Sequence, residues 1–408
     1  MMIAKEGTME KIYDIIIWGA SGFTGRLAVD YIYKNQGNSN LTWAVAGRNE
    51  SKISEVLDGK DIPILIADSH DKESLVDLVK QTKVILTTVG PYARYGSELV
   101  EACAENGTHY CDLTGEVHWM RHMISKYQKT AKESGAKIVH TCGFDSIPSD
   151  IGVYFLQKNM RELHGVNAKQ IKYRTRGFSG GASGGTVDSL MSMMEQAKKD
   201  SSILKIIANP YALNDKHKGL DGPDKMSPYF DDDFDAWVGP FIMAGINTRV
   251  VRRTNELLDN IYGEDFEYNE GSITGKGPKG LIGATTSGMV TGGMAGMAAF
   301  SPTRSILKSF LPKPGEGPSE ETMENGYFEI ELLGIHPTDR SKDMRVWIHG
   351  DKDPGYKSTA KMISESALSL AQDELSVGGG FWTPASAMGD NLIDRLPNAG
   401  VTFKVMDN

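Results

Sequence analysis

Cysteine is scarce in this sequence, and its scarcity excludes two classes of protein. Only three occur among 408 residues, Cys103, Cys111 and Cys142, without the short paired spacing of zinc ligands or the even set of a disulfide framework. We therefore expect reduced thiols and a cytoplasmic protein. His118 and His122 lie four residues apart, but no third ligand stands beside them, so we expect no metal site.

An excess of positive charge is also missing. Lys and Arg number 44 against 53 Asp and Glu, which gives a formal net charge of −9 and a pI near 5.6. A nucleic-acid binder usually carries a basic face, so we expect no nucleic-acid partner. Residues 1–11 are polar and mixed in charge, so we expect no signal peptide.

Glycine is abundant, and three glycines near the N-terminus form the most informative motif. The apolar run Ile15–Trp18 stops at Gly19, Gly22 and Gly25 follow, and a helical pattern begins. In a dinucleotide-binding unit, the first glycine allows the tight turn, the second lets the backbone meet the pyrophosphate and the third lets the helix pack on the sheet. An ordinary glycine turn is the alternative. The residues expected to hold the cofactor here are Gly19, Ala20, Ser21, Gly22, Phe23, Thr24 and Gly25.

The second strand indicates which dinucleotide binds. It spans Leu41–Arg48, and no acid follows until Glu50. NAD sites usually place an acid near this position, whereas NADP sites use arginine for the 2′-phosphate, because the guanidinium gives two charge-assisted bonds. Arg48 therefore predicts NADP, and the alternative is a surface arginine that caps a loop.

The first part of the chain alternates strands with helices. Strands are expected at 15–18, 41–48, 62–67, 84–89, 109–112 and 137–142, with helices at 73–80, 97–105 and 117–134 between them. This order predicts an α/β fold with a doubly wound parallel Rossmann sheet, which binds ligands at the carboxyl ends of its strands. The segments expected on that rim are Gly19–Gly25, Arg48, Asp68, Val89–Tyr92, Asp112–Glu116 and Gly143–Asp150. We expect Asp68 to help bind the cofactor and Val89, Gly90 and Pro91 to line its nicotinamide end.

A second α+β domain should follow, for substrate and for dimer contacts. The expected boundaries are 1–147 for the NADP-binding domain, 148–355 for the second domain, and 356–408 for a segment that returns to the first. Alternating residues predict strands at 170–178, 327–333 and 344–350. A glycine loop at 180–186 precedes a helix, so it either holds an anion or packs closely. The acidic run Asp231–Asp235 reads as a solvated loop.

The segment Leu281–Phe300 carries no charge over 20 residues, with Gly288, Gly292 and Gly296 at four-residue spacing. Length and spacing resemble a membrane helix, but its glycines and hydroxyls lower its hydrophobicity. We expect a buried or substrate-lining helical hairpin, with peripheral membrane contact or a lipid-like substrate as further interpretations.

The sequence resembles the saccharopine-dehydrogenase-like oxidoreductases, which include the mycobacterial trans-acting enoyl reductases of lipid synthesis. The motifs that carry the resemblance are Gly19–Arg26, Ala46–Arg48, Val89–Gly96, Tyr110–Glu116, Cys142–Asp150, Ser183–Thr186, Pro314–Glu320, Phe381–Asp390 and Gly400–Phe403. They cover nearly the whole chain. The resemblance implies an NADP-binding domain, a second α+β domain and reduction chemistry. Saccharopine reductases bind an amino-acid carboxylate through an arginine cluster, which the sequence reading does not find, so the enoyl reductases are the nearer match.

Together these features predict an NADPH-dependent reductase that passes hydride to an electrophilic carbon, such as an enoyl carbon of a lipid or polyketide intermediate. The reaction needs a proton donor or an enolate stabiliser. Tyr92 is the first candidate because it follows the expected nicotinamide loop, and Tyr95 and Asp145 are next. Structural roles remain open for all three. The alternatives are a saccharopine-type dehydrogenase and a non-catalytic NADP sensor or scaffold. We expect a homodimer.

Overall fold

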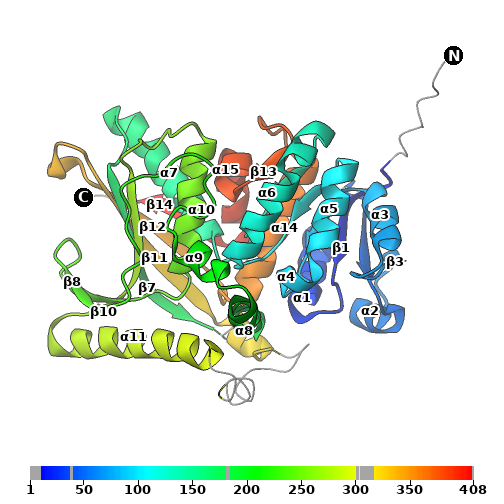
Figure 1. The fold of residues 1–408 in the computed structure, drawn as a ribbon, viewed down its shortest axis with the longest axis horizontal. Coiled ribbons are helices and arrows are strands. Elements are labelled where there is room, and N and C mark those ends of the chain that lie inside the picture. The colour runs from blue at the N-terminus through cyan, green and yellow to red at the C-terminus, as the bar shows by residue number, and fades with distance from the viewer. Residues whose placement is uncertain (1–10, 37–39, 181–183, 300–302, 304–316, 407–408) are drawn as a thin grey trace.

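The computed structural model describes residues 11–36, 40–180, 184–299, 303 and 317–406. Parts of the expected glycine loop at 180–186 and of the motif at 314–320, and Phe300, lie outside these residues. Two seven-stranded sheets organise the chain, with the N-terminal half on the right of Figure 1 and the second sheet on the left.

The first sheet is parallel throughout and has the strand order β13-β6-β5-β4-β1-β2-β3. The predicted Rossmann fold is thereby confirmed. Its strands are β1 (Tyr13–Trp18), β2 (Trp43–Gly47), β3 (Ile64–Ile66), β4 (Thr82–Thr87), β5 (His109–Cys111), β6 (Lys137–Val139) and β13 (Gly380–Trp382). The sequence reading missed β13, which comes from the far end of the chain and has only three residues.

Helices cover both faces of this sheet, as the apolar run in β1 requires. Ile15 and Ile17 enter one core and Ile16 and Trp18 another, because alternate side chains of a strand point to opposite faces. The helices of this half are α1 (Phe23–Gln36), α2 (Glu50–Leu57), α3 (Lys72–Lys80), α4 (Tyr92–Tyr95), α5 (Ser97–Asn106), α6 (Val117–Ser134) and α14 (Lys357–Gln372).

The second sheet is mixed, with the order β14-β12-β11-β7-β10-β9-β8. Only β7 and β10 run parallel to each other; the remaining pairs are antiparallel. The strands are β7 (Gln170–Ser179), β8 (Tyr229–Asp231), β9 (Ala236–Gly239), β10 (Glu267–Gly275), β11 (Tyr327–Ile335), β12 (Met344–Gly350) and β14 (Val401–Val405). The helices are α7 (Ile147–His164), α8 (Gly184–Lys199), α9 (Ser202–Ala208), α10 (Ala244–Leu257), α11 (Gly277–Ala299), α13 (Glu320–Glu324) and α15 (Pro384–Arg395), with short 3-10 helices η1 (Arg340–Lys342) and η2 (Leu396–Ala399).

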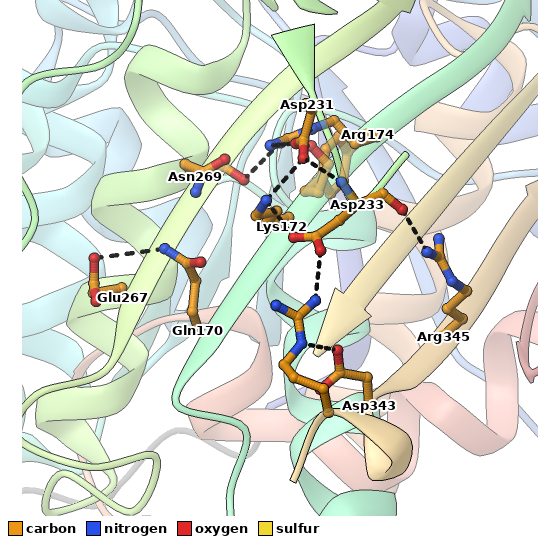
Figure 2. A network of polar contacts seen from close by, with 11 residues as sticks. Gln170, Lys172, Arg174, Asp231, Asp233, Glu267, Asn269, Asp343 and Arg345 are labelled. Atoms are coloured by element: carbon orange, nitrogen blue, oxygen red, sulfur yellow. Dashed lines mark hydrogen bonds and ion pairs between the residues drawn. The ribbon is translucent and has the colours of Figure 1, made fainter. Parts of the chain in front are cut away.

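One face of the second sheet packs apolar residues such as Ile171 and Leu332 against α7, in the same core that reaches β1. The opposite face is ionic (Figure 2). Asp231, only 3% exposed, accepts bonds from Lys172 (2.8 Å) and from two nitrogens of Arg174 (2.7 and 3.2 Å). The expectation that the acidic run is a solvated loop is therefore wrong for its first residue, because β7 supplies the buried Arg174 and the partly buried Lys172 to pair with it.

The uncharged segment forms one helix, α11, rather than the expected hairpin. It lies along the edge of the second domain, at the lower left of Figure 1, and packs on β9, β10 and α8. It is only partly buried: Ala284 and Ala298 are fully buried, whereas Ile282, Met289 and Val290 are 66%, 71% and 57% exposed. Within the described part of the chain, no helix combines the length and hydrophobicity needed to cross a bilayer.

The C-terminal segment contributes helices and strands to both halves of the molecule. Helix α14 packs on α1, β1, β4 and β5, and β13 then extends the first sheet beyond β6. Helix α15 packs on α7, and β14 finally pairs with β12 in the second sheet. Tyr31 of α1 donates a 2.7 Å bond to Glu365 of α14, which fixes the two helices against each other.

Candidate active site at the carboxyl ends of the first sheet

The glycine loop has the geometry of a dinucleotide cradle. Gly19 adopts φ +92°, a conformation that side chains disfavour. A Cβ on Gly25 would lie 2.1 Å from the Gly19 carbonyl oxygen, so close packing of α1 demands glycine. A Cβ on Gly22 would meet only that same oxygen, at 3.2 Å. The protein's own packing therefore crowds Gly22 far less than Gly25, and Gly22 is exposed at the rim where a phosphate would approach.

The loops after β1 and β4 meet at this rim. A Cβ on Gly19 would lie 2.5 Å from Cγ2 of Val89, so the two loops are in direct contact. Gly90 is exposed beside them and Pro91 is buried. The structure thus brings together the residues expected at the phosphates and at the nicotinamide.

The two residues expected near the adenosine end lie farther along the sheet. Arg48 follows β2 directly and its side chain is exposed. Asp68 lies just past β3, where its carboxylate accepts a 2.9 Å bond from the backbone N–H of His70. Arg48 is available to a ligand at the rim, whereas Asp68 already caps its own turn.

Tyr92 begins α4 and is buried. Its hydroxyl donates to the Thr87 carbonyl (3.2 Å) and accepts from the backbone N–H of Leu113 (3.1 Å). Burial, and secondarily the charge of Asp112, raises its pKa well above the ordinary value. Both hydrogen-bonding roles of the hydroxyl are therefore occupied within the protein.

Tyr95 ends α4 and lies elsewhere. Its ring packs against His70, with 5.7 Å between ring centroids. That contact places it on the side of the loop after β3, beside Asp68. The expected trio of Tyr92, Tyr95 and Asp145 therefore does not form a single cluster.

Asp145 lies in the loop between β6 and α7 and is partly buried. Burial raises its pKa to about 7, and the charge of Asp112 adds to the shift. The charge of Asp145 is also the smallest of the contributions that raise the pKa of Tyr92. A carboxyl with a pKa near neutrality exchanges a proton readily, which is what proton transfer requires.

A buried carboxylate that sequence reasoning left unassigned organises the ends of β5 and β6. Asp112 accepts bonds from the Tyr110 hydroxyl (2.9 Å), from Nδ1 of His140 (2.7 Å) and from the backbone N–H of Thr114 and Thr141 (3.1 Å each). Thr141 has φ +63°, a strained conformation for a β-branched residue. Asp112 therefore holds a distorted backbone just before the loop that carries Asp145.

A second unassigned network lies beneath the same loop. Ser146 donates to the side-chain oxygen of Asn247 (3.1 Å), and Asn247 donates to Glu270 (3.0 Å). The Tyr268 hydroxyl also donates to Glu270 (2.7 Å). Burial raises the pKa of Glu270 to about 7. This network joins the loop after β6 to β10 and α10.

Three arginines lie close together on α10, and Arg249, Arg252 and Arg253 are all buried. Arg249 and Arg252 pair with Asp224 and Asp221. Arg253 donates to the carbonyls of Leu213 and Phe381. The guanidinium groups therefore hold the segment 207–224 and β13, and they are engaged by the protein itself.

Comparisons with known proteins agree with this geometry. The family model described as the saccharopine dehydrogenase NADP-binding domain matches residues 15–139. A trans-acting enoyl reductase of Mycobacterium ulcerans is 35% identical over 419 residues, covering 96% of this chain and 97% of its own. A Mycobacterium tuberculosis protein that carries the same name provisionally is 38% identical over 415 residues, with the same coverage.

Solved structures share the fold over both halves. Saccharopine dehydrogenase (L-Glu forming) from Saccharomyces cerevisiae has a TM-score of 0.53 at 13% identity, covering 97% of this chain and 100% of its own. Homospermidine synthase from Legionella pneumophila has a TM-score of 0.54 at 10% identity, covering 97% and 92%. These structures show a shared fold. The family model and the full-length relatives show that the chain belongs to the saccharopine dehydrogenase-like family of NAD(P)-dependent oxidoreductases.

Proposed function

We propose that the protein is an NADPH-dependent reductase that transfers hydride to an enoyl carbon of a lipid or polyketide intermediate. The observation that carries the proposal is the full-length similarity to trans-acting enoyl reductases on a chain whose rim has the NADP-binding pattern. Gly22 and Arg48 are exposed on that rim. Bound NADPH supplies the hydride, and the chain's residues bind, orient and protonate.

In this proposal Asp145 is the proton donor. When a C–H bond forms at the β-carbon, the electrons of the C=C bond shift toward the carbonyl oxygen, and the α-carbon then takes a proton. Asp145 is the best supported donor because its pKa is about 7 and because the Tyr92 hydroxyl is fully bonded. Tyr92 and Tyr95 stay untested candidates, with Tyr95 disfavoured by its position beside His70.

The saccharopine-type alternative has less support. It needs arginines available for an amino-acid carboxylate, and the three arginines of α10 are bonded to aspartates and carbonyls. An assay that follows NADPH absorbance separates the candidates. We expect oxidation with a medium-chain or long-chain enoyl thioester and none with an oxo acid plus lysine or glutamate. NADPH binding without oxidation by any acceptor would favour the sensor or scaffold.

The length of the acceptor's alkyl chain and the oligomeric state of the protein are also part of this proposal. The exposed apolar residues of α11 support a surface for an alkyl chain, a membrane or a second copy of the protein. Shortening the acceptor's alkyl chain while following kcat/KM tests the first role. Vesicle flotation tests the second and analytical ultracentrifugation tests the third.

A further inference from the structure

One buried carboxylate contacts both halves of the molecule at the rim. Glu116 precedes α6, at the end of the loop that follows β5, and is 1% exposed. Its Oε1 accepts the backbone N–H of Tyr92 (2.8 Å) and the hydroxyl of Ser189 (2.9 Å), and its Oε2 accepts the backbone N–H of Ala93 (3.0 Å). Three bonds to a charged acceptor are each worth more than bonds between neutral groups.

Two of these bonds fix the segment that follows the expected nicotinamide loop. Tyr92 and Ala93 come directly after Val89–Pro91, and Val89 in turn touches Gly19. The position of this segment relative to the glycine cradle thus depends on Glu116. The carboxylate does not lie on the cofactor loops themselves, so it acts on the site through the backbone.

The third bond fixes α8, a helix of the second domain. An exposed ion pair between Arg94 and Glu195 (2.9 Å) also joins α8 to the first domain, and Gln196 of α8 faces His118 of α6. Toward its own domain it packs through a small separate cluster with Met191 and Met194 facing Met294 and Met297 of α11. Methionine packing adapts easily, so the directional, partly buried bond to Glu116 is the more demanding constraint on the position of α8. Figure 1 shows α8 at the boundary between the halves.

We infer that Glu116 is a positioning residue that ties α8 to the start of α4, and that α8, ordered in this way from the cofactor side, forms part of the surface that binds the acceptor. This inference rests on the proposed function, because it takes the rim to be an NADPH site. If Val89–Pro91 line the cofactor, its binding would order this loop and the start of α4 that follows it. The bonds of Glu116 to Tyr92, Ala93 and Ser189 would then extend that order to α8.

Hydrogen–deuterium exchange of the full chain, with and without NADPH, tests the link. In the wild type we expect NADPH to slow exchange both in 89–96 and in α8. Ser189→Ala removes only the hydrogen bond between α8 and Glu116. NADPH should therefore still slow exchange in 89–96 but should no longer slow exchange in α8. For the same variant we expect acceptor KM to rise about tenfold to a hundredfold, as for a lost bond to a charged group, with the Kd of NADPH changed less than threefold.

Glu195→Gln is the matched control, because it breaks a contact between the same two helices that is exposed and therefore weak. It should leave exchange and KM at wild-type values. Glu116→Gln keeps the size of the side chain but replaces one acceptor oxygen with an N–H₂ donor that faces other donors. It should speed exchange in both 89–96 and α8 and lower kcat as well.

Two outcomes overturn the inference. One is that NADPH binds but leaves exchange in α8 unchanged in the wild type. The other is that Ser189→Ala behaves like Glu195→Gln. A failure of the proposed function looks different: NADPH then produces no thermal shift and no slowing in 89–96. The link itself is still decided in that case, by whether Ser189→Ala speeds exchange in α8 of the free protein.

Discussion

The two sheets of this protein bury their faces by different means. The first packs apolar side chains on both faces, as the split of Ile15 and Ile16 between two cores shows. The second packs one apolar face and covers the other with ion pairs around Arg174 and Asp231 (Figure 2). An apolar face tolerates many side chains of similar volume, whereas a buried ion pair needs both partners. The second sheet should therefore be more sensitive to the loss of a single polar atom.

Asp231→Ala should have the largest effect on stability in this comparison, because it removes the central acid of the ionic face of the second sheet. It leaves Arg174 buried without its partner, so we expect a loss of about 3–5 kcal/mol in the free energy of unfolding. Denaturant titration measures it. Asp235→Asn, four residues along the same turn, removes the charge of an exposed pair with Lys276 and keeps a side chain that tolerates the φ of 47° there, so it should cost about 0–1 kcal/mol. Equal losses would mean that burial does not separate the two aspartates.

Gly22→Val tests the corresponding claim for the first sheet, that its rim is shaped for a ligand. The nearest atom to the added side chain would be a carbonyl oxygen 3.2 Å away, so we expect a cooperative melt without any thermal shift from NADPH. Gly25→Val should fail to fold normally, because its Cβ would lie 2.1 Å from backbone. A normal shift in Gly22→Val would contradict the phosphate-binding role.

Arg48→Ala probes the cofactor's 2′-phosphate. Loss of a charge-assisted contact typically costs about 1.5–3 kcal/mol, so the Kd of NADPH should rise by about one to two orders of magnitude. NADH lacks the phosphate, and its Kd should stay nearly constant. Fluorescence titration measures the Kd of both cofactors. If the Kd of NADH rose as much as that of NADPH, Arg48 would not bind the 2′-phosphate.

Glu270→Gln should change the pH dependence of stability. The pKa of Glu270 is about 7 in the fold against an ordinary value of 4.5. Between these values the folded protein holds a proton that the unfolded chain releases, so wild-type stability falls as pH rises from 4.5 to 7. One such group contributes a slope of at most about 1.4 kcal/mol per pH unit. Melts across this range should give a flatter curve for the variant, and identical curves would contradict the assignment.

The sequence predicted the first sheet better than the second, for a physical reason. A parallel strand between two helical layers reads as an uninterrupted apolar run, as in β1, and Gly19 and Gly25 are required by local geometry. Strand β7 alternates cations with apolar residues, which indicates one solvated face. The burial of Arg174 in this strand depends on Asp231, which comes 57 residues later in the chain. A local sequence pattern therefore cannot predict it.

The same limit applies to the site. The residues that follow strands, such as Arg48 and Val89, were placed correctly on the rim by topology alone. The contacts of their side chains were not predictable. The Tyr92 hydroxyl is hydrogen-bonded within the protein, and Glu116 links the two domains only because Ser189, on a helix of the other domain, bonds to it. The helical hairpin expected for the glycine-rich segment 281–300 was wrong, because 281–299 belong to one helix and glycine only weakens a helix without ending it.

The return of the C-terminal segment to the first sheet has a consequence for biosynthesis. When the ribosome has completed the first 150 residues, the face of α1 and β4 that α14 later covers is still bare, and β6 is an open sheet edge until β13 arrives. We expect the nascent N-terminal half to remain incompletely folded until the final fifty residues emerge, a period in which chaperones rather than the chain itself protect its apolar surface.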